Sequence, residues 1–84
     1  LMNYYVYLIG NKKKNTLITY VGYTNNLRKR LKLHNAGKGA KFTRGRSWKI
    51  LYSEKYITKK EAISREYYIK KNRKLRNLIK NIYK

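Results

Sequence analysis

The sequence predicts a single α+β domain, a three-stranded antiparallel sheet flanked by helices in the order ββαβαα. Two runs rich in β-branched and aromatic residues, at residues 4–9 and 17–23, lie on either side of a polar turn at residues 10–15 and favour an antiparallel hairpin. Residues 48–56 alternate in part between apolar and polar side chains, which predicts a third strand. The 84 residues leave room for one domain, taken as 1–84, and 42% hydrophobic residues provide a small core.

The first helix is predicted from its capping residues. Asn25 or Asn26 can cap a helix over residues 27–36, and Gly37 can end it. A basic, glycine-rich loop follows at residues 37–47.

A capping box begins the second helix. In Thr58-Lys59-Lys60-Glu61, we expect Thr58 and Glu61 to bond each other's free amide groups. This helix is predicted to run to about Asn72, and a further basic helical stretch occupies residues 74–83.

The composition points to a polyanionic partner. Lys and Arg number 23 against 3 acidic residues, and the self-repulsion of a formal net charge of +20 is best tolerated when a polyanion neutralises it. Nucleic acid fits because basic side chains release counterions from its phosphates. An anionic membrane surface is the rival partner, but it would require one long basic amphipathic helix, whereas here the charge is spread between strand-like runs.

Several other classes of site and location are excluded. The chain has no cysteine, which rules out disulfides and cysteine-based zinc sites. No apolar stretch approaches the length of a membrane span, and the sequence contains no pattern of a signal peptide. We therefore expect a cytoplasmic, nucleoid-associated protein without a membrane partner.

The first predicted helix carries two candidate catalytic side chains. Leu27 and Leu31 place its apolar face against the core. Arg30 and His34 share that face one turn apart, so we expect both at the edge of the core. The alternative is that Arg30 extends over the core with its charge in water and that His34 interacts with the helix dipole.

Glu66 is the candidate metal ligand. It lies on the same face of the second predicted helix as Ala62 and Ile69, where a carboxylate requires an explanation. The alternative is a surface ion pair with Lys70 one turn later.

The other two carboxylates have structural explanations, because Glu61 belongs to the capping box and Glu54 is expected to pair with neighbouring lysines. One carboxylate is enough for a single Mg²⁺ or Mn²⁺ ion, which keeps several waters and also binds substrate phosphate. Such an ion would stabilise charge on the phosphate and the leaving oxygen of a phosphodiester. Arg30 could add a cation, and His34 or a tyrosine could act as the base.

Tyrosines of the hairpin are further candidates. Alternation places Tyr5, Tyr7 and Ile9 on one face of the first strand. Tyr20 shares its face with Gly22, whose missing side chain leaves space for another group or a phosphate. The alternative is aromatic packing within the hairpin, since 10 of the 84 residues are tyrosine.

The loop at residues 37–47 is predicted to contact nucleic acid. It alternates cations with an aromatic residue and glycines, a pattern suited to phosphate contacts and to stacking on bases or sugars. The alternative is a solvated loop. The candidate binding residues are Lys38, Lys41, Phe42, Thr43, Arg44 and Arg46.

Together these motifs resemble the GIY-YIG nuclease domain, and in particular its small single-domain members. Tyr5-Val6-Tyr7 stands where the family has GIY, and Tyr20-Val21-Gly22 stands for YIG. The resemblance covers nearly the whole chain in order and spacing. It continues through Arg30 and His34, the loop GKGAKFTRGR before Trp48, and Ala62-Ile63-Ser64-Arg65-Glu66 followed by Ile69-Lys70.

The resemblance implies a nuclease that uses five side chains and one divalent metal ion. Tyr7 would act as the general base or position the water, and Tyr20 would hydrogen-bond near the water or the scissile phosphate. Arg30 would stabilise the pentavalent phosphate, His34 would assist proton transfer, and Glu66 would hold the ion.

Two features depart from the family pattern. Tyr5 replaces the first glycine of GIY, a position without side-chain chemistry. Some members use an asparagine after the glutamate-bearing helix, and none of Asn72, Asn77 and Asn81 lies in a matching motif.

We therefore predict a Mg²⁺- or Mn²⁺-dependent endonuclease that hydrolyses DNA, with a role in DNA repair or recombination. Branched and single-stranded DNA are candidate substrates, RNA stays open, and a protein partner could supply targeting. One alternative is a non-catalytic nucleic-acid-binding module with the same fold, although all five site residues are present. Another is a basic RNA- or ribosome-associated protein, which leaves Glu66 unexplained.

Overall fold

The computed structural model describes residues 2–83 and contains the three strands and three helices in the predicted order. The strands are β1 (Tyr4–Lys13), β2 (Thr16–Thr24) and β3 (Lys49–Tyr56), and the helices are α1 (Leu27–Asn35), α2 (Lys59–Lys71) and α3 (Arg73–Ile82). The sheet has the order β2-β1-β3, and both pairs are antiparallel. The predicted α+β fold is therefore confirmed.

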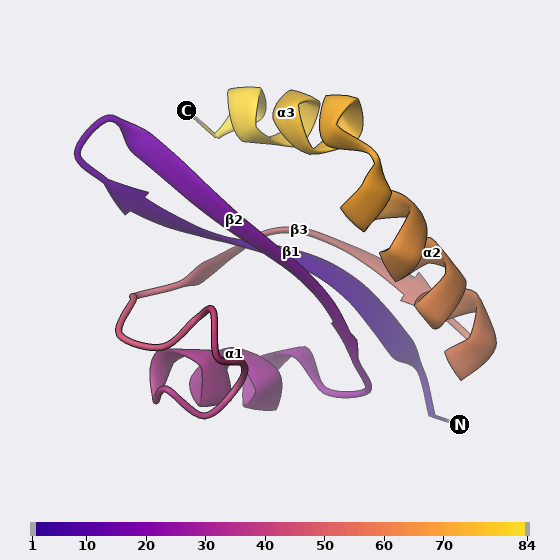
Figure 1. Cartoon of the computed structure of the whole chain (residues 1–84). Coiled ribbons are helices and arrows are strands. Elements are labelled where there is room, and N and C mark those ends of the chain that lie inside the picture. Colours follow the sequence, from indigo (N-terminus) through magenta and orange to yellow (C-terminus); the bar gives the residue numbers. More distant parts are fainter. Residues whose placement is uncertain (1, 84) are drawn as a thin grey trace.

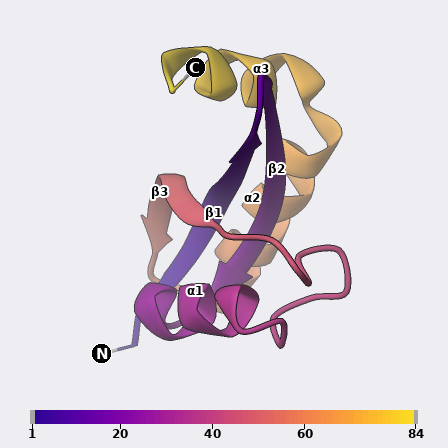
Figure 2. The ribbon, with the colours of Figure 1, turned by 90° about the vertical axis from the view of Figure 1, so that its left-hand side faces the viewer.

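The sheet separates two apolar clusters. Val6 and Leu8 of β1 pack against α2 and α3 on one face. Tyr7 and Ile9, which alternate with them, pack against α1 and Trp48 on the other face. Figure 1 shows α1 and the loop after it on one side of the sheet with α2 and α3 on the other, and Figure 2 shows the same arrangement from the side of α1.

The hairpin differs from the prediction at its turn. β1 continues through Gly10 to Lys13, which pairs with Thr16, so the turn contains only Lys14 and Asn15. Lys14 has a positive φ of 57°, as the favoured two-residue hairpin turns require. Polar residues favour turns, which is why the sequence predicts a longer one, but pairing with β2 keeps them extended. Because β3 pairs with β1 only as far as Gly10, the end of the hairpin projects beyond the third strand (Figure 1).

A β-bulge explains the partial alternation of β3. Tyr52 pairs with Leu8 and Ile50 pairs with Ile9, which makes Leu51 the extra residue. Leu51 and Tyr52 consequently both pack on the face covered by α2 and α3, although they are adjacent in sequence.

The predicted capping residues begin helices α1 and α2. Asn26 accepts a hydrogen bond from the Lys29 amide at 3.0 Å and caps α1. Thr58 accepts one from the Glu61 amide at 3.2 Å and caps α2. The Glu61 carboxylate accepts from the Thr58 hydroxyl at 2.9 Å rather than from its amide, so only half of the predicted capping box forms. Within residues 2–83, no helix combines the length and the apolar character needed to cross a membrane.

Candidate active site

The hairpin places the two candidate tyrosines on one face of the sheet. Tyr7 lies opposite Gly22, and Tyr20 lies opposite Ile9. A Cβ atom added to Gly22 would lie 2.4 Å from the Tyr7 hydroxyl oxygen, so the phenol occupies the space that the glycine leaves. From the sequence, either another protein group or a phosphate could fill the space beside Gly22. In the structure, the Tyr7 phenol fills it.

Helix α1 delivers His34 to the same face. His34 is only 1% exposed. Its Nε2 lies 2.8 Å from the Tyr7 hydroxyl, and its Nδ1 lies 2.9 Å from the Thr43 hydroxyl. Gly39 allows the loop to cover the ring, since a Cβ atom there would lie 2.4 Å from Nδ1. The prediction that His34 lies at the edge of the core is therefore wrong, because the loop encloses it.

The hydrogen bonds around His34 define its tautomer. The Thr43 hydroxyl donates to the Ala40 carbonyl oxygen at 3.0 Å, so its oxygen is left to accept from His34 Nδ1–H. Nε2 of the neutral imidazole then carries a lone pair and accepts from the Tyr7 hydroxyl. A directed chain of hydrogen bonds thus runs from Tyr7 through His34 and Thr43 to the backbone.

The surroundings of Tyr7 and His34 set their protonation. Burial, and then the nearby charge of Arg30, lowers the pKa of His34 below its ordinary value of 6.5. The imidazole is therefore neutral at neutral pH. Burial raises the pKa of Tyr7 well above its ordinary range, although the Arg30 charge opposes this shift. Tyr7 therefore keeps its proton unless an adjacent base such as Nε2 accepts it.

Arg30 on α1 acts electrostatically on both Tyr7 and His34, and Glu66 on α2 acts on Tyr7. Arg30 is half-buried on α1, and its charge lowers the pKa of both Tyr7 and His34. Glu66 lies on α2 with its side chain 17% exposed, and its carboxylate is 3.5 Å from Lys70 Nζ, so the ion pair weighed from the sequence forms. The Glu66 charge contributes to the raised pKa of Tyr7, which places it within electrostatic range of the phenol.

Tyr20 connects the buried histidine to the surface. It meets the His34 ring edge-on at a centroid distance of 5.3 Å and stacks on Phe42 at 6.1 Å. Phe42 is 51% exposed, and the Arg46 guanidinium lies 5.4 Å from the centroid of its ring. An unbroken series of rings therefore leads from His34 to solvent.

Hydrogen bonds attach the loop at residues 37–47 to its surroundings. The Trp48 amide donates to Asn35 Oδ1 at 2.6 Å, and the Trp48 indole donates to the Thr43 carbonyl oxygen at 2.9 Å. Thr43 is 0% exposed, which corrects the prediction that it contacts nucleic acid: it supports His34 instead. The other predicted binding residues have exposed or half-buried side chains, namely Lys38, Lys41, Phe42, Arg44 and Arg46.

Glu54 belongs to a network that the sequence did not reveal. Arg65 Nε and Nη2 donate to its two oxygens at 2.8 and 2.9 Å, and the hydroxyls of Tyr52 and Tyr56 donate to the same carboxylate. Burial by itself would raise the pKa of Glu54, but these hydrogen bonds outweigh it and lower the pKa to about 2. The predicted pairing with lysines is wrong, because α2 places Arg65 over β3.

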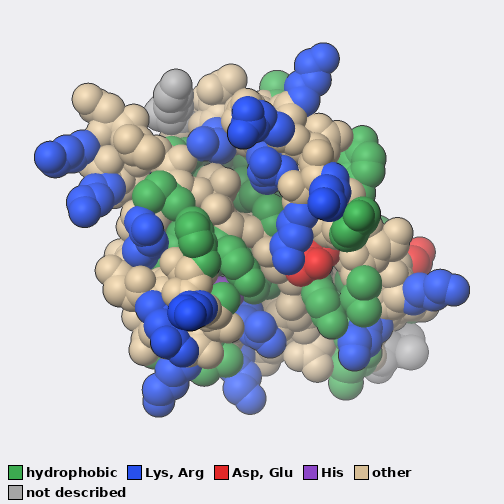
Figure 3. Space-filling view, viewed as in Figure 1, with side chains coloured by type: hydrophobic (Ala, Val, Ile, Leu, Met, Phe, Trp, Pro, Cys, Tyr) green, Lys and Arg blue, Asp and Glu red, His purple; other side chains and the backbone are tan. Residues whose placement is uncertain are grey.

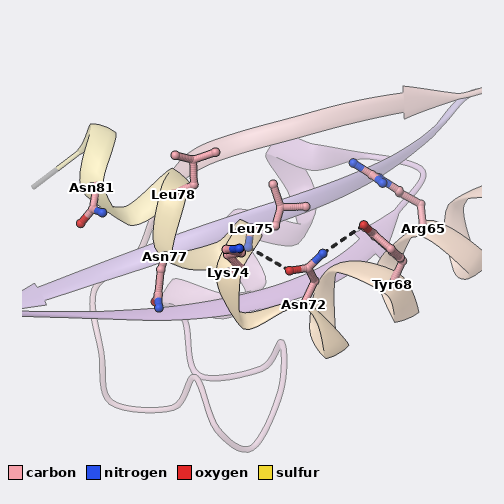
Figure 4. Close-up of a pocket in the computed structure, with 8 residues that line it drawn as sticks. All are labelled: Arg65, Tyr68, Asn72, Lys74, Leu75, Asn77, Leu78 and Asn81. Atoms are coloured by element: carbon pink, nitrogen blue, oxygen red, sulfur yellow. Dashed lines mark hydrogen bonds between the residues drawn. The ribbon is translucent and has the colours of Figure 1, made fainter.

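The asparagines that follow α2 line a groove between α2 and α3 (Figure 4). Asn72 Oδ1 accepts from the Leu75 amide at 3.0 Å and caps α3, and its Nδ2 donates to the Tyr68 hydroxyl at 3.0 Å. Asn77 and Asn81 line the same groove, which contains none of the five candidate catalytic residues. Asn72 therefore serves the α2–α3 connection.

Comparison with known proteins agrees with the fold and identifies the family. Residues 3–80 match the family described as the GIY-YIG catalytic domain. The chain belongs to the GIY-YIG family. As the sequence motifs predict, it therefore has a catalytic domain of the nuclease type.

Similar proteins within the GIY-YIG family carry the name UPF0213. The chain is 54% identical over 68 residues to a UPF0213 protein of Clostridium perfringens, across 80% of this chain and 70% of the relative. It is 48% identical over 68 residues to one of Oceanobacillus iheyensis, across 80% and 76% of the two chains. The solution NMR structure of a UPF0213 protein from Bacillus halodurans has 36% sequence identity and a TM-score of 0.51, covering 96% of this chain and 85% of that one.

The available ligands suit a cation that needs few protein groups. Within residues 2–83, no cluster of three or more His, Cys, Asp or Glu side chains could hold a metal ion. Glu66 provides one carboxylate that is largely shielded from solvent. Mg²⁺ commonly binds one or two carboxylates and completes its coordination with water and substrate phosphate. Glu66 therefore fits a single Mg²⁺ or Mn²⁺ ion better than a metal that requires an all-protein site.

Proposed function

We propose that this GIY-YIG protein is a divalent-metal-dependent endonuclease that hydrolyses DNA phosphodiester bonds, with a role in repair or recombination. The observation that supports this proposal most is the directed chain of hydrogen bonds from the Tyr7 hydroxyl through neutral His34 to Thr43. A binding module does not require a buried neutral imidazole aligned with a phenol. Proton transfer requires both the alignment and the free lone pair on Nε2.

Tyr7 activates the attacking water in the proposed reaction. As the water gives a proton to the Tyr7 oxygen, the phenol passes its own proton to His34 Nε2, so no free phenolate accumulates. The hydroxide attacks phosphorus, the bond to the leaving oxygen breaks, that oxygen takes up a proton from solvent, and the imidazolium returns its own proton to solvent. Tyr7 is 3% exposed, which allows contact with a small molecule such as water and keeps the nucleic acid backbone away from it.

The remaining candidates supply charge and positioning. Arg30, whose charge already acts on Tyr7 and His34, would stabilise the additional negative charge on the phosphate. Glu66 would hold a Mg²⁺ or Mn²⁺ ion, which when bound neutralises charge on the phosphate and the leaving oxygen. Tyr20, half-buried beside His34, would hydrogen-bond to the substrate phosphate.

The charge of the chain favours a nucleic acid as the substrate. Figure 3 shows Lys and Arg side chains spread over the face in view rather than gathered at one place. With a net charge of +20, such a surface attracts a polyanion without orienting it. Orientation would come from exposed Phe42 and from the cations of its loop, through stacking and phosphate contacts.

Cleavage assays with plasmid, branched and single-stranded DNA and with RNA, in Mg²⁺ or Mn²⁺, test the proposal. Glu66→Ala and Arg30→Ala should each reduce cleavage by about 10²-fold or more while retention of DNA on a gel stays near that of the wild type. Glu61→Ala is the matched control. It removes an exposed carboxylate from the first turn of the same helix, so it should leave cleavage unchanged.

Two results would oppose the proposal. Retention of nucleic acid without metal-dependent cleavage on any substrate would instead identify a non-catalytic nucleic-acid-binding module. Equal residual cleavage by wild type and Glu66→Ala would assign the activity to a contaminating nuclease.

A further inference from the structure

A second cationic segment lies beside the loop that carries Phe42. The end of the β1–β2 hairpin projects past β3, and Asn11 Nδ2 of this segment donates to the Ser47 carbonyl oxygen at 2.8 Å. The two segments line one open groove, in which Lys13 of the hairpin lies across from Arg44 and Arg46 of the loop. The hydrogen bond joins residues that are 36 positions apart, so no local pattern indicates this groove.

The geometry of both segments favours an anion in the groove. Alternation along β1 places Lys13 on the same face as Asn11, which is the face that meets the loop. On the loop, Gly45 has a φ of +75°, a conformation that L-residues rarely adopt, and it bends the chain between Arg44 and Arg46. Among residues 2–83, no acidic side chain lines the groove. The cations therefore have no carboxylate partner within it.

Side-chain contacts connect the groove to the candidate active site. Arg46, which lines the groove, lies over the Phe42 ring at 5.4 Å. Phe42 stacks on Tyr20 at 6.1 Å, and Tyr20 meets His34 at 5.3 Å. A strand lying in the groove could therefore reach Tyr20, which lies against His34, without leaving the protein surface.

We propose that this groove binds the phosphodiester backbone of the substrate on one side of the scissile bond, with Lys13 and Arg44 each contacting a phosphate. The inference rests on the proposed nuclease function, and it adds the hairpin as a second binding element to the loop. Backbone contacts of this kind set the register of a nucleic acid and make its affinity depend on salt.

The test measures binding of a fluorescein-labelled DNA oligonucleotide, single-stranded and as a duplex, in EDTA so that no metal-dependent cleavage occurs. In Lys13→Gln/Arg44→Gln, loss of two phosphate contacts should lower affinity roughly ten- to thirty-fold near physiological salt. The slope of log affinity against log salt should become shallower by about 1.4 to 1.8. With Mg²⁺, the same variant should raise KM and leave kcat near its wild-type value.

The matched control is Lys60→Gln/Arg73→Gln, which removes the same charge from exposed positions on α2 and α3. It should keep the wild-type salt slope. Equal slopes for the groove variant and this control, with equal melting temperatures, would overturn the inference. If the wild type shows no cleavage, and the groove variant still binds DNA more weakly than the wild type, then the nuclease proposal is wrong and the proposal that the groove binds nucleic acid is supported.

Discussion

Replacing Gly22 with alanine most directly perturbs the proposed proton relay, the transfer of a proton from the Tyr7 hydroxyl to His34 Nε2. The added Cβ atom would lie 2.4 Å from the Tyr7 hydroxyl oxygen and 2.6 Å from the ring carbon that bears it. Ordinary van der Waals contact requires about 3.5 Å, so the phenol must move by about 1 Å. Such a shift would lengthen or misalign the 2.8 Å hydrogen bond to His34 Nε2.

The expected effects on activity and stability follow from that displacement. A misplacement of about 1 Å in a catalytic group costs on the order of 10²-fold in rate, so kcat should fall by that amount in Gly22→Ala. Overpacking a closely packed site should also lower the free energy of unfolding by about 1–3 kcal/mol. Steady-state cleavage rates, corrected for the folded fraction from thermal melts, measure both effects.

Gly10→Ala is the matched control on the neighbouring strand. Its Cβ atom would lie 2.6 Å from Leu51 Cδ1, on the sheet face opposite Tyr7, so it should cost similar stability while the folded protein cleaves normally. Adding Tyr7→Phe to Gly22→Ala removes the closest atom but leaves the ring carbon at 2.6 Å, so it should recover only part of the stability and none of the activity. A wild-type kcat in Gly22→Ala would refute the relay, because the phenol could then work away from Nε2.

Three further predictions concern the surroundings of the site. Thr43→Val should lower kcat by roughly 10- to 100-fold, since His34 Nδ1–H loses the acceptor that fixes its tautomer. Thr43→Ser keeps the hydroxyl and should retain most activity. Equal kinetics of the two variants would show that Thr43 contributes only packing. Because the folded His34 has a lowered pKa, the unfolded chain binds the extra proton, so stability should fall as the pH drops below about 6.5, and cleavage should fall at a lower pH, where the folded imidazole gains a proton. His34 is the single histidine of the chain, so His34→Asn should remove this dependence of stability on pH, and an unchanged profile would contradict the assignment. Glu54→Gln should lower the free energy of unfolding at neutral pH by about 3 kcal/mol by leaving Arg65 without its carboxylate. The wild type should lose the same contribution to the free energy of unfolding as the pH falls from 4.5 towards about 2. If thermal melts show that Glu54→Gln loses as much stability over this pH range as the wild type, the Glu54 network is not the cause of the loss.

Local features of the sequence predicted the elements and most of the candidate site. The strands, the caps at Asn26 and Thr58 and the helix boundaries depend on neighbouring residues, and the structure bears them out to within a few positions. The longer turn at the hairpin was the exception, because strand pairing overrode the polar composition of residues 10–13. Motif spacing supplied the five candidate catalytic residues and the family.

Contacts between distant residues required the tertiary structure. Tyr7 and His34 are 27 positions apart, and their hydrogen bond forms only because Gly22 makes room for the phenol and Gly39 lets the loop close over the imidazole. Thr43 was predicted to contact nucleic acid because it lies in a basic loop, but folding buries it against His34.

The sequence by itself determined which side chains are candidates for catalysis, because residue type and local spacing decide what a group can do. The tertiary structure decided which group donates in each hydrogen bond around His34 and made that imidazole neutral. It also brought the cations of Lys13 and Arg44 into one groove. The physical reason is that pKa values and hydrogen-bond direction depend on burial and on partners brought together by folding, and neither is a property of the local sequence.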